Sequence, residues 1–171
     1  RDIGPDDIVC GIAAGGTTPY VHGALRRGRA RGARTVFVSC VQPVVNEPAV
    51  DVVIRPLVGP EVVTGSTRLK AGTATKLVLN TLTTVTMVRL GKVYGNLMVD
   101  LKCTNQKLWD RGARITATIT GATRERAMDL LKRADGHVKA AVVMHERNVD
   151  LAGANALLAA AHGSLRGAIA R

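Results

Sequence analysis

A carboxylate, three small hydroxyl side chains and two cations lie close together in "GPEVVTGSTRLKAG", residues 59–72. Hydroxyl and backbone N–H groups at the start of a helix bind phosphate well, because the helix dipole favours an anion there. A carboxylate beside such a loop can move a proton on a bound phosphosugar. The alternative is plain helix capping by Ser66 or Thr67, with both cations in solvent. The candidate residues are Glu61, Thr64, Ser66, Thr67, Arg68 and Lys70.

A second candidate is "GIAAGGTTPY", residues 11–20, which follows an apolar run. Gly15 and Gly16 allow backbone N–H groups to approach a ligand, and Thr17 and Thr18 add hydroxyl donors at a helix start. The pattern is neither GxGxxG nor a P-loop, so we do not expect nucleotide binding. A simple turn with a helix N-cap is the alternative interpretation.

The elements that position these loops read as alternating strands and helices. Residues 7–16, 34–41 and 49–59 are apolar, partly β-branched runs, and helical spacing lies between the first two. This alternation predicts an α/β fold with a parallel sheet, so both candidate loops meet at the carboxyl edge of that sheet. Typical sheets have about five or six strands. We therefore expect further strands from an upstream segment or another chain, and the start at Arg1 without Met suggests the same.

The rest of the sequence predicts helices. Residues 66–90 have almost no charge after Lys76, which predicts one long, largely buried helix, and residues 92–115 predict another. In the second helix, Asn96 and Asp100 would lie one turn apart, facing a pocket, a partner subunit or a neighbouring helix. After about residue 115, three or four short helices are expected. Their predicted N-caps are Thr123, Asp150 and Ser164.

Composition narrows the function classes. The chain has 171 residues and a net charge of +11, but its aromatic content is 2%. Scarce aromatics argue against single-strand binding, so we interpret the charge as a solvated helix face and expect no nucleic-acid partner. Three separated cysteines and four histidines without ligand spacing predict neither a metal site nor disulfides, and the histidines are expected at the surface or at caps. Free thiols fit a reducing cytoplasm, and no signal peptide or membrane span is expected.

The quoted loops also resemble one family. "GPEVVTGSTRLKAGTATKLVLN", residues 59–80, is similar to the signature shared by N-acetylmuramic acid 6-phosphate etherases and glucokinase regulatory protein. The similarity continues through "GKVYGNLMVDLKCTNQKL" and "GIAAGGTTPYV". It implies a sugar isomerase (SIS) fold, a parallel sheet between helices that usually forms homodimers. Residues 1–112 would be this domain without its N-terminal half, and residues 113–171 a C-terminal helical bundle.

The resemblance implies a lyase that cleaves the D-lactyl ether of N-acetylmuramic acid 6-phosphate, giving N-acetylglucosamine 6-phosphate and D-lactate, with no metal or cofactor. Glu61 would stand where related isomerases carry a catalytic glutamate, while the family's main acid/base glutamates lie upstream of this chain. The implied phosphosugar-binding residues are Gly15, Gly16, Thr17, Thr18, Ser66, Thr67, Arg68 and Lys70.

One departure from the family pattern keeps an alternative open. Etherases often read Ser-Gly-Arg-Thr-Pro where this chain has Gly15 to Pro19, so the first hydroxyl is absent. A non-catalytic regulatory protein that senses sugar phosphates would tolerate this loss better than an enzyme.

Overall fold

The computed structural model describes residues 2–170, which divide into two compact units. The first unit ends at Leu82 and the second begins at Thr83, so the division falls within one long helix. This division follows packing alone, and the domain boundary expected after residue 112 stays a prediction.

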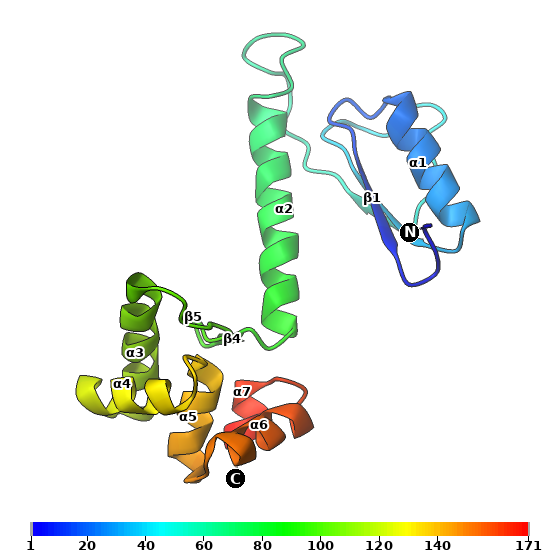
Figure 1. The fold of residues 1–171 in the computed structure, drawn as a ribbon. Coiled ribbons are helices and arrows are strands. Elements are labelled where there is room, and N and C mark those ends of the chain that lie inside the picture. The colour runs from blue at the N-terminus through cyan, green and yellow to red at the C-terminus, as the bar shows by residue number, and fades with distance from the viewer. Residues whose placement is uncertain (1, 171) are drawn as a thin grey trace. The chain divides into compact units, whose positions relative to one another are not determined.

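The first unit contains a three-stranded, fully parallel sheet in the order β1-β2-β3 (Figure 1). Its strands are shorter than predicted, because only the β-branched centres of the apolar runs are paired. Helix α1, Pro19–Ala30, packs on the sheet and buries Leu25 beside Phe37. The predicted α/β class with a parallel sheet is confirmed. The strands are β1 Ile8–Ile12, β2 Arg34–Val38 and β3 Val52–Ile54.

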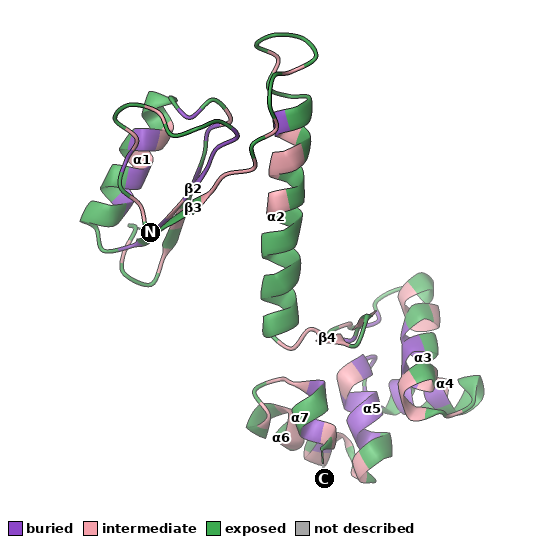
Figure 2. Cartoon of the chain, turned by 180° about the vertical axis from the view of Figure 1, so that it is seen from behind, coloured by how far each residue is buried: buried purple, intermediate pink, exposed green. Residues whose placement is uncertain are grey.

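Helix α2, Lys70–Arg89, confirms the predicted long helix but not its predicted burial. Figure 2 shows exposed surface along most of α2. Leu77 is 57% exposed and Val85 is 48% exposed. An apolar pattern indicates that a helix needs cover, but it cannot show that the cover lies within the same chain. All six side chains predicted to be buried are exposed: Leu69, Leu77, Leu79, Leu82, Val85 and Val88.

The second unit begins with a correction to the predicted helix at residues 92–115. Strands β4, Val93–Tyr94, and β5, Leu97–Met98, form an antiparallel hairpin at the start of this range, and only its end, from Gln106 onward, is helical as predicted. Gly95 has φ 58° at the first position of the two-residue turn, where hairpins favour glycine. Consequently Asn96 lies in the turn, and it does not share a helix face with Asp100.

Five helices complete the second unit, and the three predicted caps are confirmed. The side chains of Thr123, Asp150 and Ser164 each accept a hydrogen bond from a backbone N–H in the first turn of their helix. Most of helix α5 is buried at the centre of an aliphatic core. The helices are α3 Gln106–Thr120, α4 Arg124–Arg133, α5 Val138–Arg147, α6 Leu151–Ala160 and α7 Leu165–Ile169.

Within residues 2–170, no helix has both the length and the apolar character needed to cross a membrane.

Candidate functional site

Glu61 is bound to the first turn of α2. Its carboxylate accepts hydrogen bonds from the backbone N–H of Lys70 at 2.8 Å and of Ala71 at 3.0 Å. The ammonium of Lys70 in turn donates to the carbonyl of Pro60 at 2.9 Å. The hydrogen bonds from Ala71 and then Lys70 lower the pKa of Glu61 from its ordinary value, because they stabilise the ionised carboxylate. Glu61 therefore acts as a distant N-cap of α2.

The hydroxyl run lies in the loop between Glu61 and α2. Figures 1 and 2 show this loop arching past the N-terminal end of the helix. Backbone hydrogen bonds shape it, including one from the N–H of Gly72 to the carbonyl of Thr67 at 2.8 Å. Ser66 is half-buried, whereas Thr67 and Arg68 are exposed. Glu61, rather than Ser66 or Thr67, accepts the N–H groups of Lys70 and Ala71 in the described structure.

The loop after β1 is a tight turn. Gly16 has φ 77°, and its N–H donates to the carbonyl of Ala13 at 2.9 Å. Gly15, Thr17 and Thr18 follow the same strand, and both threonines are exposed. Thr18 stands at the N-cap position of α1, but its side chain makes no capping hydrogen bond. The start of α1 therefore presents threonine hydroxyls to solvent, as a site for an anion would require.

Cys40 links the two candidate loops at the carboxyl edge of the sheet. Its backbone N–H donates to the carbonyl of Ala14 at 2.9 Å. Its thiol lies 3.7 Å from the carbonyl oxygen of Ala71 and 3.7 Å from the hydroxyl of Thr75. The structure thus brings the loop after β1 and the start of α2 to the same residue. Among the described residues, no hydrogen bond joins Thr17 or Thr18 to the hydroxyl run itself.

His22 differs from its prediction as a surface or capping residue. It is 8% exposed, and its Nε2 lies 2.6 Å from the carbonyl oxygen of Gly16. Its ring packs edge to face on Phe37, with centroids 5.8 Å apart. His22 lies on the face of α1 that packs on the sheet, and its ring contacts the turn at Gly16.

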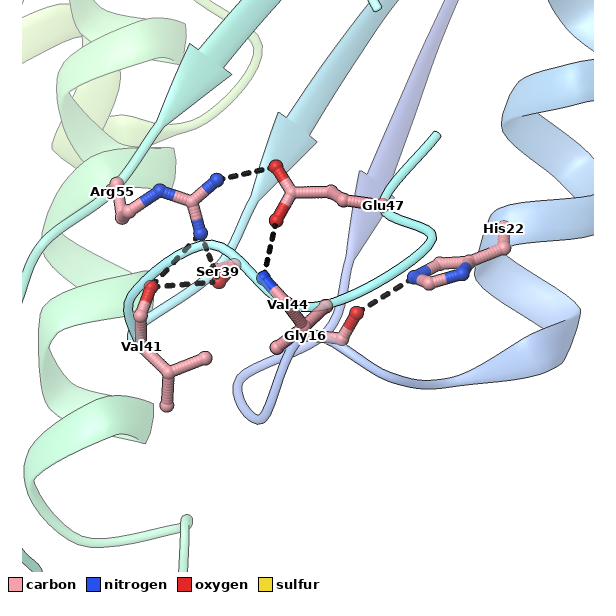
Figure 3. Close-up of polar contacts among 7 residues, drawn as sticks. All are labelled: Gly16, His22, Ser39, Val41, Val44, Glu47 and Arg55. Atoms are coloured by element: carbon pink, nitrogen blue, oxygen red, sulfur yellow. Dashed lines mark hydrogen bonds and ion pairs between the residues drawn. The ribbon is translucent and has the colours of Figure 1, made fainter. Parts of the chain in front are cut away.

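Glu47 and Arg55 form an ion pair at this edge that the sequence did not reveal (Figure 3). Arg55 follows β3 directly, and its guanidinium also donates to the hydroxyl of Ser39 at 3.0 Å and to the carbonyl of Val41 at 2.9 Å. An available signal was the charge of Arg55 inside the apolar run predicted as a strand at residues 49–59, with the opposite charge of Glu47 two residues before that run. Their pairing depends on the path of the loop between β2 and β3, which the sequence pattern does not define.

The described residues contain no cluster of three or more histidine, cysteine or acidic side chains suited to a metal ion. All three cysteines are free thiols.

Comparison with known sequences gives two results. Residues 95–139 match the C-terminal lid domain of glucokinase regulatory protein. Curated relatives named N-acetylmuramic acid 6-phosphate etherase match almost the whole chain. The sequence from Nostoc sp. is 53% identical over 170 residues, which is 99% of this chain and 55% of that protein. The sequence from Picosynechococcus sp. is 54% identical over 170 residues, 99% of this chain and 56% of that protein.

A third relative of the same name, from Microcystis aeruginosa, is 53% identical over 169 residues. The chain spans about half the length of these relatives. The parallel sheet and helices described above are consistent with part of the SIS-type α/β fold that the resemblance implies. Over the half that it spans, the predicted resemblance to the N-acetylmuramic acid 6-phosphate etherases is confirmed, since these relatives are similar to nearly every residue of the chain.

Proposed function

We propose that this chain is part of an etherase that cleaves the D-lactyl ether of N-acetylmuramic acid 6-phosphate. The observation that carries the proposal is the 53% identity, over 99% of the chain, to a relative of that name. Elimination breaks the ether carbon–oxygen bond and releases D-lactate, and one water then adds to the sugar. The products are N-acetylglucosamine 6-phosphate and D-lactate, as expected in the catabolism of cell-wall amino sugars.

The described residues are assigned to binding the phosphosugar. Thr17, Thr18, Ser66 and Thr67 supply hydroxyl donors, and the nearby Gly15 and Gly16 let backbone N–H groups approach the ligand. Arg68 and Lys70 add positive charge beside the hydroxyl run. The exposure of the threonines and the link through Cys40 support this assignment, because both loops border one edge of the sheet.

Proton transfer is assigned mainly to residues outside this chain. Elimination needs a base for the sugar proton and an acid for the departing lactate oxygen, and each contributes about 10² to 10⁴ in rate. Glu61 is the carboxylate beside the hydroxyl run, and both of its oxygens accept backbone N–H groups of α2. We therefore expect Glu61 to hold the loop in place and the remaining half of the protein to supply the acid and the base.

The exposed apolar side chains of α2 favour an interface with another segment or subunit in the full-length protein. Most of its leucines and valines are exposed among the described residues, and a shallow hollow of about 630 Å³ lies beside Leu69, Thr73 and Leu77. We propose that the rest of the protein and the other subunit of a homodimer cover them. Free thiols fit the expected cytoplasmic location, and the proposal includes no cofactor and no nucleic-acid partner.

The test uses the full-length protein. Purified protein is incubated with N-acetylmuramic acid 6-phosphate, and D-lactate is measured over time. Unphosphorylated N-acetylmuramic acid serves as the control, and it should react far more slowly because the phosphate contacts are absent. No D-lactate above the uncatalysed level from the phosphorylated sugar would contradict the proposed activity.

A regulatory protein that senses sugar phosphates is the second candidate, favoured by the match of residues 95–139 to the lid domain of glucokinase regulatory protein. The same experiment separates the two. A sensor would bind N-acetylglucosamine 6-phosphate in a calorimetric titration and would release no D-lactate, whereas an etherase would do both.

A further inference from the structure

The turn at Gly16 is held from two sides by residues that do not belong to the proposed phosphosugar loops. On one side, the buried ring of His22 binds the carbonyl of Gly16. On the other side, the side chains of Val41 and Val44 lie so close that a Cβ on Gly16 would stand 3.2 Å from each of them. The position of the loop after β1 therefore depends on where these two valines are fixed.

The Glu47–Arg55 ion pair fixes both valines through their backbones (Figure 3). Arg55 donates to the carbonyl of Val41 at 2.9 Å. The second oxygen of Glu47 accepts a hydrogen bond from the N–H of Val44 at 3.4 Å. The ion pair thus holds the loop after β2 in a conformation in which Val41 and Val44 pack against the turn at Gly16.

Burial makes this pair more than a surface contact. The side chains of Arg55 and Glu47 are 16% and 15% exposed. Partial removal from water strengthens their attraction, and loss of one partner leaves the other charge poorly solvated. By contrast, the pair between Arg31 and Asp2 in the same unit leaves Asp2 91% exposed, so it should contribute little.

We propose that Glu47 and Arg55 are positioning residues that hold the loop of Gly15 to Thr18 in its phosphosugar-binding conformation. This inference rests on the proposed function, because it gives the pair a role in that same site. Neither residue needs to touch the ligand. Loosening the pair lets the valines withdraw, the turn relaxes, and the N–H and hydroxyl donors of the loop lose their fixed directions.

The experiment compares full-length variants at a temperature where each is folded, as judged by its thermal unfolding. Glu47→Gln and Arg55→Met each remove one charge of the pair, and Arg55→Lys keeps the charge but cannot make the same forked contacts. Asp2→Asn is the matched control, since it removes a carboxylate from the exposed pair of the same unit. KM and kcat for D-lactate release are measured, together with the Kd for N-acetylglucosamine 6-phosphate.

We expect Glu47→Gln and Arg55→Met to raise KM and Kd about tenfold, equivalent to losing one well-aligned polar contact. The fall in kcat should be smaller, because phosphate contacts lie away from the reacting bond. Arg55→Lys should recover part of the affinity, and Asp2→Asn should match the wild type.

Three outcomes would overturn the inference. A lowered melting temperature with unchanged KM and Kd would show that the pair is only structural. An Arg55→Lys variant as impaired as Arg55→Met in catalysis but unchanged in Kd would show a role in the reaction itself. A wild-type protein that neither binds the sugar phosphate nor releases D-lactate would overturn the proposed function, and the inference with it.

Discussion

The carboxylate of Glu61 accepts a hydrogen bond from the backbone N–H of Ala71 at 3.0 Å, across ten residues of sequence. With the N–H of Lys70 also bound, Glu61 takes the position at the helix start where an anion would otherwise bind. In the proposed site, the phosphate of the sugar would then bind the hydroxyl groups of the preceding loop. We therefore expect Glu61 to have a structural role at the start of α2 rather than a catalytic one.

For Glu61→Gln we expect turnover of the full-length protein to stay within about tenfold of the wild type, because the amide oxygen can still accept one N–H of α2. The assay is D-lactate release under saturating substrate. A loss of about 10² or more with an unchanged circular dichroism spectrum would instead identify Glu61 as an acid or a base in the reaction.

Ser66→Ala should weaken binding of N-acetylglucosamine 6-phosphate by about 1 to 3 kcal/mol, as expected when a hydrogen bond to a charged group is lost. Isothermal titration calorimetry on the full-length protein measures this change. Ser164→Ala is the control, since its hydroxyl caps α7 and accepts from the N–H of Gly167. Equal affinities for wild type and Ser66→Ala would move the phosphate to other residues.

Asp100 makes the stability of the second unit sensitive to acid. Its hydrogen bonds with Lys139 and then Lys92 lower its pKa, because both ammonium groups favour the carboxylate. A lowered pKa means that the stabilisation is present above the unfolded value of about 3.9 and is lost as pH falls through the folded value. Urea denaturation of Asp100→Asn should therefore show a flatter dependence on pH below about 4 than the wild type.

The matched control for that experiment is Asp135→Asn, which breaks an exposed pair with Lys102. It should leave the acid dependence nearly unchanged. If Asp100→Asn and the wild type lost stability in parallel on acidification, the ion pair between Asp100 and Lys139 would contribute nothing to the acid dependence of stability.

Thr116 offers a stabilising change. Its hydroxyl is buried within α3 and has no hydrogen-bond partner among the described residues. Thr116→Val removes an unsatisfied polar atom at nearly constant shape, so unfolding should cost about 1 kcal/mol more. The comparison is Thr118→Val, which loses a hydrogen bond to the carbonyl of Arg114 at 2.8 Å and should not stabilise. A destabilised Thr116→Val would mean that the hydroxyl has a partner in the full-length protein.

The strands of the first unit and the helix caps of the second could be predicted from local patterns. The β-branched runs before Gly15 and after Gly32 form strands, and the polar caps at Thr123 and Asp150 begin helices as expected. These predictions succeed because strand propensity and capping depend on a few neighbouring residues.

Three of the misses depend on partners distant in sequence, whereas the fourth is a local turn. The leucines of α2 are exposed in the described part of the chain, although their apolar pattern predicted burial. Glu47 and Arg55 meet only because the loop after β2 folds back, and His22 is buried only because α1 lies on the sheet. At residues 92–100, apolar spacing fitted a helix, but Gly95 directed a hairpin.

The central claim is that this chain binds the phosphosugar while the acid and the base come from the rest of the protein. The direct measurement is D-lactate release from N-acetylmuramic acid 6-phosphate by the 171-residue chain and by the full-length protein at equal concentration. The account predicts steady turnover by the full-length protein and none above background by the chain alone, because each missing proton-transfer group removes about 10² to 10⁴ in rate. Comparable turnover by the two would contradict it and would place the catalytic pair within these residues.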